Sequence, residues 1–179
     1  RIETGEPAGI FTVRLVENRF IDRDQARQLI VCPATELAES IQSRQIRIQI
    51  PSFAVYQSAK GTVLVGFQKT IGGSLAYRLP FLRNGEYTAL RNTYRKDIAV
   101  LSDAPNPQDP SFKSCNHGRY GQNVLFQDLR VDYLKGPLCN TNRHDHLFLN
   151  HDGLPIASTD PFDSVLGPSD AVLSNFGVH

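Results

Sequence analysis

The sequence predicts an α+β fold, in which an N-terminal helical segment packs on an antiparallel sheet, and three observations support this class. Apolar residues recur at helical spacing in the first quarter of the chain. Beyond residue 46 they alternate or cluster in short runs, as they do in strands. After residue 135 the chain is rich in Asp, Asn, Gly and Pro, which predicts loops.

Length and composition predict one domain. The chain has 179 residues, of which 40% are hydrophobic and 21% are charged. A chain of this size buries about two-thirds of its unfolded surface and sustains its own core. We therefore expect a single domain over 1–179, with an unassigned lead-in over 1–20 and a loop-rich peripheral tail over 136–179.

Two helices are expected before the sheet. Asp22 or Asp24 is placed to cap a helix over 25–30. A second helix is expected over 34–44, where apolar residues four apart form one face, and we expect that face to pack on the sheet. The segments expected to form strands are 47–50, 62–67, 74–79, 98–101, the two arms of a hairpin within 122–134, and 147–149.

The three cysteines allow three different single disulfides, each of which leaves one thiol free. We favour a bond between Cys115 and Cys139, because the hairpin over 122–134 would bring its two flanks together. Cys32, which precedes Pro33, is expected to be a buried thiol at the end of a strand. Three reduced thiols in a cytosolic protein are the alternative.

Charge and hydropathy exclude several functional classes. There are 19 basic and 18 acidic residues, so no excess of positive charge favours nucleic acid or an anionic membrane. No apolar run is long enough to span a bilayer, so we expect any membrane helix to lie upstream of Arg1. The sequence has no phosphate loop, nucleophile elbow or dinucleotide fingerprint, and we expect neither a catalytic site nor a cofactor.

The tail contains the densest group of potential metal ligands, which are His144, His146, His151 and Asp152. In an extended chain His144 and His146 point to the same side and offer two imidazoles to one ion. The spacing matches no zinc motif, and a solvated polar loop is the alternative interpretation. A metal-binding protein or metal-dependent enzyme is therefore the second functional hypothesis.

Residues 116–128, with the sequence NHGRYGQNVLFQD, resemble the planctomycete-type His-x9-Asp-Gly proteins, which are related to type II secretion G-like pseudopilins. The matching positions are His117, Asn123 and Asp128. Residues 30–33 and 99–103 resemble two further landmarks of that family, and 145–153 with 163–166 resembles the closing segment of some members. The chain departs from the pattern in two ways: the interval from His117 to Asp128 is one residue longer, and Leu129 stands where Gly is usual.

The resemblance implies a pseudopilin-like α+β domain and no catalytic chemistry. It also implies that the domain is periplasmic or extracellular and that the full-length protein is anchored by an N-terminal membrane helix. The first functional hypothesis is therefore a non-enzymatic structural or interaction domain of a bacterial envelope protein. Its partners would be other envelope proteins or further copies of itself.

Overall fold

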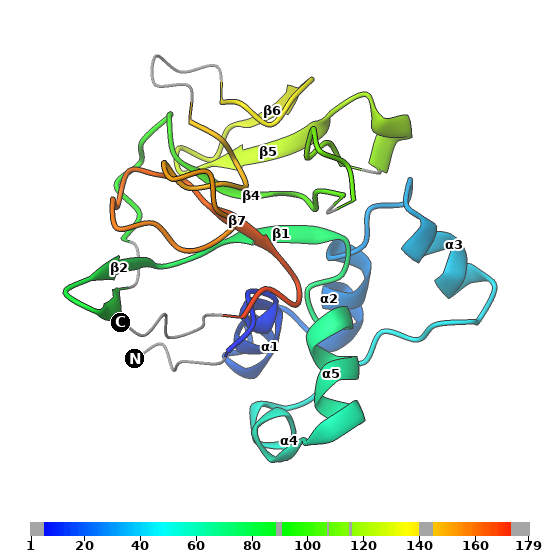
Figure 1. Ribbon diagram of the computed structural model, residues 1–179. Coiled ribbons are helices and arrows are strands. Elements are labelled where there is room, and N and C mark those ends of the chain that lie inside the picture. Colours follow the sequence, from blue (N-terminus) through cyan, green and yellow to red (C-terminus); the bar gives the residue numbers. More distant parts are fainter. Residues whose placement is uncertain (1–5, 89–90, 107, 115, 140–144, 173–179) are drawn as a thin grey trace.

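The computed structural model describes residues 6–88, 91–106, 108–114, 116–139 and 145–172. Helices dominate the first part of the chain and strands the rest (Figure 1). The helices are α1 (Ile10–Glu17), α2 (Arg23–Leu29), α3 (Glu36–Gln42), α4 (Phe53–Ser58), α5 (Gly61–Thr70) and the short 3₁₀ helix η1 (Asn116–Arg119). The strands are β1 (Leu75–Arg78), β2 (Phe81–Arg83), β3 (Glu86–Thr88), β4 (Ala99–Asp103), β5 (Gln122–Phe126), β6 (Val131–Leu134) and β7 (Leu166–Pro168).

The predicted α+β class is confirmed. Five strands form one antiparallel sheet in the order β6-β5-β4-β1-β7, and β2 pairs with β3 in a separate hairpin. The strands expected over 74–79 and 98–101 are β1 and β4, and the hairpin expected within 122–134 is β5 with β6. The positions expected for these strands are therefore confirmed.

Helix α2 is confirmed together with its cap. The Asp22 carboxylate accepts hydrogen bonds from the backbone N–H groups of Asp24, at 2.9 Å, and Gln25, at 2.8 Å. The Gln25 side chain accepts a hydrogen bond from the Asp22 N–H at 3.1 Å, which completes a capping box. Local side-chain chemistry thus determines where this helix begins.

Helix α3 forms within the expected range, but its apolar face packs elsewhere than predicted. Thr35 caps it by accepting a hydrogen bond from the Ala38 N–H at 3.0 Å. Leu37 and Ile41 pack in a cluster built mainly from the helices and their connections, not on the five-stranded sheet. Figure 1 shows α3 beside α2, on the outside of the molecule. The apolar face was correctly identified, but it packs against this helical cluster.

The strand expected over 62–67 is wrong, because this segment is part of α5. Val63 and Val65 are 57% and 48% exposed, whereas Leu64 and Phe67 pack against the helical cluster and Ile71 is fully buried within it. The spacing of 64, 67 and 71 is helical, and it becomes visible only when the apolar run is extended beyond residue 67.

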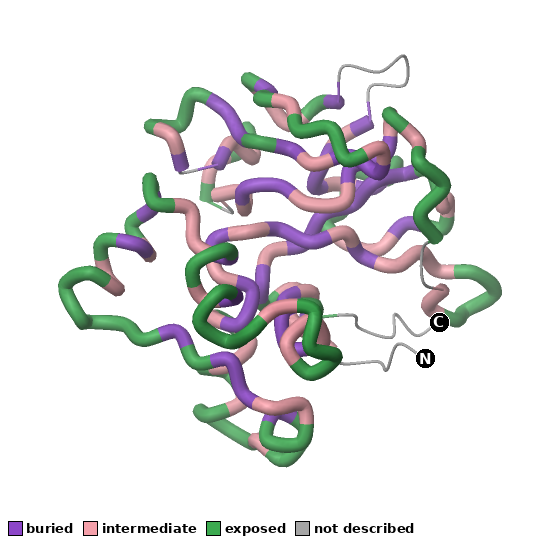
Figure 2. Tube along the Cα trace, turned by 180° about the vertical axis from the view of Figure 1, so that it is seen from behind, coloured by how far each residue is buried: buried purple, intermediate pink, exposed green. Residues whose placement is uncertain are grey.

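Two further expected strands do not form. Ile48 and Ile50 are buried and alternate with exposed residues, but their segment is extended chain without a strand partner among the described residues. Residues 147–149 form a turn, from which Leu147 and Phe148 enter the core beneath the sheet. The segment after residue 135, expected to be peripheral, thus supplies core residues and strand β7. Figure 2 shows buried chain running through the strands at the centre of the molecule.

No helix in the described part of the chain is long and apolar enough to cross a bilayer.

Candidate functional site

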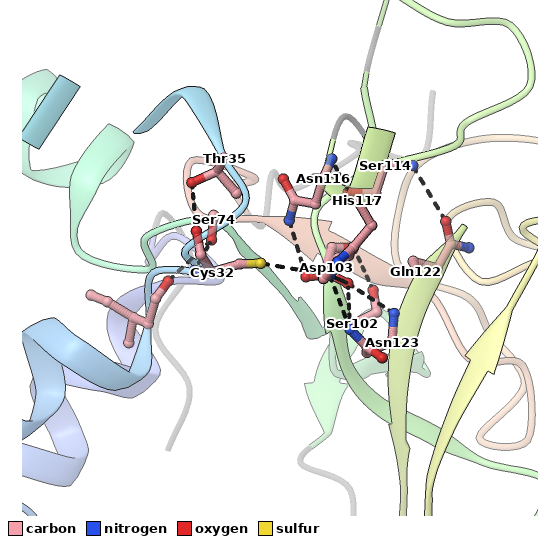
Figure 3. A network of polar contacts seen from close by, with 11 residues as sticks. Cys32, Thr35, Ser74, Ser102, Asp103, Ser114, Asn116, His117, Gln122 and Asn123 are labelled. Atoms are coloured by element: carbon pink, nitrogen blue, oxygen red, sulfur yellow. Dashed lines mark hydrogen bonds and ion pairs between the residues drawn. The ribbon is translucent and has the colours of Figure 1, made fainter. Parts of the chain in front are cut away.

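Three segments that lie far apart in the sequence meet at the end of β4 (Figure 3). Cys32 follows α2, Asp103 is the last residue of β4, and His117 lies in η1. His117 Nε2 is 3.6 Å from Cys32 Sγ and 3.3 Å from Asp103 Oδ2. We call these three residues, together with Asn116 and Asn123, the Asp103 cluster.

Asp103 is a buried carboxylate at the centre of the cluster, with 4% of its surface exposed. Its Oδ1 accepts a hydrogen bond from Asn116 Nδ2 at 3.0 Å. Its Oδ2 accepts from the backbone N–H of Asn123 at 2.8 Å and from Asn123 Nδ2 at 3.3 Å. Both oxygens are therefore held in fixed directions, as a buried charge requires.

Ser74 brings Cys32 to this position. Its hydroxyl accepts a hydrogen bond from the Cys32 N–H at 2.8 Å, and its backbone carbonyl accepts one from Ala104 at 2.9 Å. Leu75, the next residue, pairs with Asp103 across β1 and β4. One residue at the start of β1 therefore holds the loop after α2 beside the end of β4.

His117 reaches the cluster through an unusual backbone conformation. Its φ and ψ are 51° and 35°, in the left-handed region, and Gly118 follows with φ 66°. A non-glycine residue adopts this region at a cost on the order of 1 kcal/mol. The imidazole also packs edge to face on Tyr133, with 6.2 Å between ring centroids.

A second layer of buried polar groups supports η1 and β5. Ser114 Oγ accepts a hydrogen bond from the Asn116 N–H at 3.1 Å, and the Ser114 N–H donates to Gln122 Oε1 at 3.3 Å. Gln122, which is fully buried, donates through Nε2 to the Gly136 carbonyl at 3.0 Å. These bonds connect the segment before the hairpin to the chain that follows it.

The arrangement differs from that of a nucleophilic triad. In a triad, the nucleophile and the carboxylate contact opposite nitrogens of the imidazole. Here the Cys32 thiol, the Asp103 carboxylate and the Asn123 amide all lie within 3.6 Å of the same atom, His117 Nε2. One ring nitrogen has one proton or one lone pair, so it serves only one of them at a time.

Two of the three residues matched to the family motif lie together. His117 Nε2 and Asn123 Nδ2 are 3.1 Å apart. Asp128 lies beyond the other end of β5, where it interacts with Arg130 at 3.6 Å. The sequence interpretation missed Cys32 and Asp103 as members of the site, although both belong to segments quoted for the resemblance.

The described members of the metal site predicted in the tail, His146, His151 and Asp152, do not gather into one group. His144 lies outside the described residues. His146 accepts a hydrogen bond from the Phe148 N–H on Nδ1 at 3.1 Å and contacts the Phe112 and Phe148 rings, and burial lowers its pKa. Within the described ranges, potential ligands gather in two groups: Cys32 with Asp103 and His117, and Asp145 with His151 and Asp163. His146 and Asp152 belong to neither group.

The second group contains two buried carboxyls. Burial, followed by the neighbouring Asp163, raises the pKa of Asp145 to about 7. One oxygen of each carboxyl is buried without a hydrogen-bond partner. Burial also lowers the pKa of Arg78 to about 10, although these carboxylates oppose that shift. The pair is therefore an internal acidic site facing a buried guanidinium.

The cysteines differ from expectation in two respects. Cys32 was expected to be buried at a strand end, but it is only partly buried and lies in the connection between α2 and α3. Cys139 is a buried free thiol whose pKa is raised to about 12 by burial. Cys115, its predicted disulfide partner, lies outside the described residues.

Comparison of the chain with protein-family models, with curated proteins and with solved structures finds no significant match. The resemblance to the His-x9-Asp-Gly proteins therefore stays a prediction from the sequence.

Proposed function

We propose that this chain is a non-enzymatic structural or interaction domain of a membrane-anchored bacterial envelope protein, located in the periplasm or outside the cell. One observation carries the proposal. Three segments quoted for the family resemblance, around Cys32, Asp103 and His117, form a single hydrogen-bonded cluster, although Cys32 and His117 are 85 residues apart. Motif residues that contact one another in this way hold distant segments of the fold together, as expected of a structural domain.

The geometry of the cluster supports a non-enzymatic role. Asp103 is buried and fully engaged, and Asn116 beside it is also buried. The carboxylate and the thiol compete for one nitrogen of His117, so the imidazole is not arranged to take a proton from Cys32 while Asp103 stabilises the imidazolium through the other nitrogen.

An apolar groove supports the interaction part of the proposal. It has a volume of about 370 Å³ and lies between α1 and one face of the sheet, with Phe11, Leu101, Leu125 and Leu129 among its lining residues. Phe11 and Leu129 are 53% and 72% exposed. We assign this groove to contact with another envelope protein or a second copy of the chain, since exposed apolar surface of this kind marks interaction sites.

A topology experiment tests the location. The full-length protein would be fused after this domain to a reporter that is active only outside the cytoplasm, and a matched fusion would lack everything upstream of Arg1. The proposal expects reporter activity from the first fusion and none from the second. Activity from neither fusion, with both made in equal amounts, would contradict the envelope location.

A crosslinking experiment tests the groove separately. A photoreactive amino acid at Leu129 should crosslink to protein in cells that make the full-length chain. The same probe at Val63, which is 57% exposed on α5, is the control and should not crosslink. Equal crosslinking from both positions, or from neither, would remove the groove from the proposal.

A further inference from the structure

We propose that Cys32, Asp103 and His117 bind one transition-metal ion of the zinc class. This inference does not depend on the envelope location. It moves the metal-binding hypothesis from the histidines of the tail to a site at the end of β4. Thiolate, carboxylate and imidazole are three of the ligand types that zinc uses in proteins.

Two of the three distances between the donor atoms match those of tetrahedral coordination. With metal bonds of about 2.3 Å to sulfur and 2.0–2.2 Å to nitrogen and oxygen, tetrahedral angles place S and N about 3.6 Å apart and N and O about 3.3 Å apart. The observed separations are 3.6 Å for Cys32 Sγ to His117 Nε2 and 3.3 Å for His117 Nε2 to Asp103 Oδ2. All three donor atoms lie within 4.8 Å of one another.

An ion also resolves the crowding around His117 Nε2. Without one, a single proton or lone pair can serve either the Cys32 thiol or the Asp103 carboxylate, but not both. With one, the nitrogen lone pair, the thiolate and Oδ2 all point at a shared central charge. The Cys32 thiol loses its proton to solvent when the metal–sulfur bond forms.

The surrounding residues orient the ligands as the outer shell of a metal site does. Asn116 fixes the second oxygen of Asp103, and Ser74 holds the backbone of Cys32. The left-handed conformation of His117 turns its ring toward the other two donors. Outer-shell partners of this kind keep ligands in place before the ion arrives and so raise affinity.

Asn123 marks the fourth coordination position. Its Nδ2 is 3.1 Å from His117 Nε2 and 3.3 Å from Asp103 Oδ2. Rotation of the amide by 180° exchanges its nitrogen and oxygen at these positions, so the side chain can present Oδ1 either to the ion or to a water bound to it. Asn123 is exposed, which leaves this side of the site open to solvent.

The donor set also selects the class of metal. Calcium and magnesium prefer oxygen ligands only, whereas a site with one thiolate and one imidazole favours zinc, cobalt or copper. The bound ion would join the loop after α2 to the sheet, because the donors come from both. Metal binding is therefore expected to stabilise the contact between the helical segment and β4.

Metal titration of the purified chain tests the proposal directly. Protein reduced and stripped with a chelator would be titrated with Zn²⁺ against a chromophoric competitor, and with Co²⁺ as a spectroscopic probe. One equivalent should bind. Cobalt should give the intense absorption of tetrahedral coordination together with a thiolate charge-transfer band. The unfolding temperature should rise with zinc concentration, as binding to the folded state requires.

Matched variants locate the site. H117Q and C32S should each weaken zinc affinity at least tenfold, and C32S should lose the thiolate band. N116A, which removes an outer-shell contact, should weaken affinity by about 10- to 100-fold. H151A and C139A, which alter the other described histidine group and the other described cysteine, should bind as the unchanged chain does.

Alkylation gives a readout that does not depend on how well the variants fold. Zinc should slow the reaction of Cys32 in the unchanged chain with iodoacetamide, as measured by mass spectrometry at that residue. Failure to bind a stoichiometric ion would overturn the proposal. Unchanged affinity in both H117Q and C32S would overturn it as well, as would a Cys32 whose alkylation rate zinc does not change.

Discussion

Replacing Asp103 by Leu removes the acceptor on which the Asp103 cluster depends, and we expect it to destabilise the domain by about 4 kcal/mol. The buried Asn116 amide loses its bond to Oδ1, and the Asn123 N–H loses its bond to Oδ2. A buried donor left without a partner costs about 1–3 kcal/mol. Asn116 is almost fully buried and Asn123 is exposed, so the first loss falls near the top of that range and the second near the bottom.

Asp103→Asn provides the matched comparison. Its remaining carbonyl oxygen can keep the bonds from Asn123, and the Asn116 amide can rotate to accept from the new NH₂ group. We therefore expect a cost of only about 1 kcal/mol, the typical net value of one hydrogen bond. The difference between the two variants isolates the effect of orphaned donors from that of lost charge.

Urea unfolding followed by far-ultraviolet circular dichroism measures both costs, with a chelator present so that metal binding does not contribute. Asp152→Asn, at an exposed carboxylate, is the control and should change stability by less than about 0.5 kcal/mol. If Asp103→Leu costs less than about 1 kcal/mol, or no more than Asp103→Asn, the cluster does not hold the fold together and the reasoning is refuted.

Three further predictions concern pH, backbone conformation and thiols. Burial raises the pKa of Asp145 to about 7, so the contribution of this carboxyl to stability is fully present below its unfolded-state pKa of 3.8 and is lost as the pH rises through 7. Unfolding temperatures measured from pH 6 to 8 should therefore fall more for the unchanged chain than for Asp145→Asn. Parallel curves would contradict this. Gly73→Ala should lower the free energy of unfolding by more than about 2 kcal/mol, because φ is +61° and a Cβ would collide with the Ile30 carbonyl. Gly85→Ala, with φ +79° and open space around it, is the control and should cost about 1 kcal/mol. Equal costs in urea unfolding would be inconsistent with the collision. Thiol counting on unreduced, denatured material tests the disulfide predicted between Cys115 and Cys139. One free thiol would fit the pairing, and three, as the free Cys139 of the structure implies, would contradict it.

Elements whose signals are local could be predicted from the sequence. The capping residues around Asp22 are adjacent in the chain. The alternation within β5 likewise fixes which of its residues face the core. In each case the interacting groups lie within a few residues, so the sequence pattern contains the whole interaction.

The sequence prediction was wrong for elements that depend on a distant partner. Residues 62–67 have a continuous apolar run, which fits a buried strand as well as a helix. The structure shows α5 because Leu64, Phe67 and Ile71 find a helical cluster to cover. Similarly, the tail was expected to be peripheral, but Leu147 and Phe148 fill the core under the sheet. The polar, Gly- and Pro-rich residues around them predicted a loop, although two large apolar side chains favour burial.

The candidate site combines both situations, which explains why the sequence identified only two of its five residues. His117 and Asn123 are six residues apart, and one short motif contains them both. Cys32 enters through Ser74, whose position follows from the pairing of β1 with β4, and no local pattern specifies that pairing. The left-handed backbone at His117 is also invisible in the sequence, since Gly118 is the only residue there that suggests it. A site that joins the loop after α2 to the end of β4 can form only once the chain has folded, so any metal affinity it has must be coupled to folding of the whole domain. The rise of the unfolding temperature with zinc, and its absence in H117Q, would demonstrate that coupling.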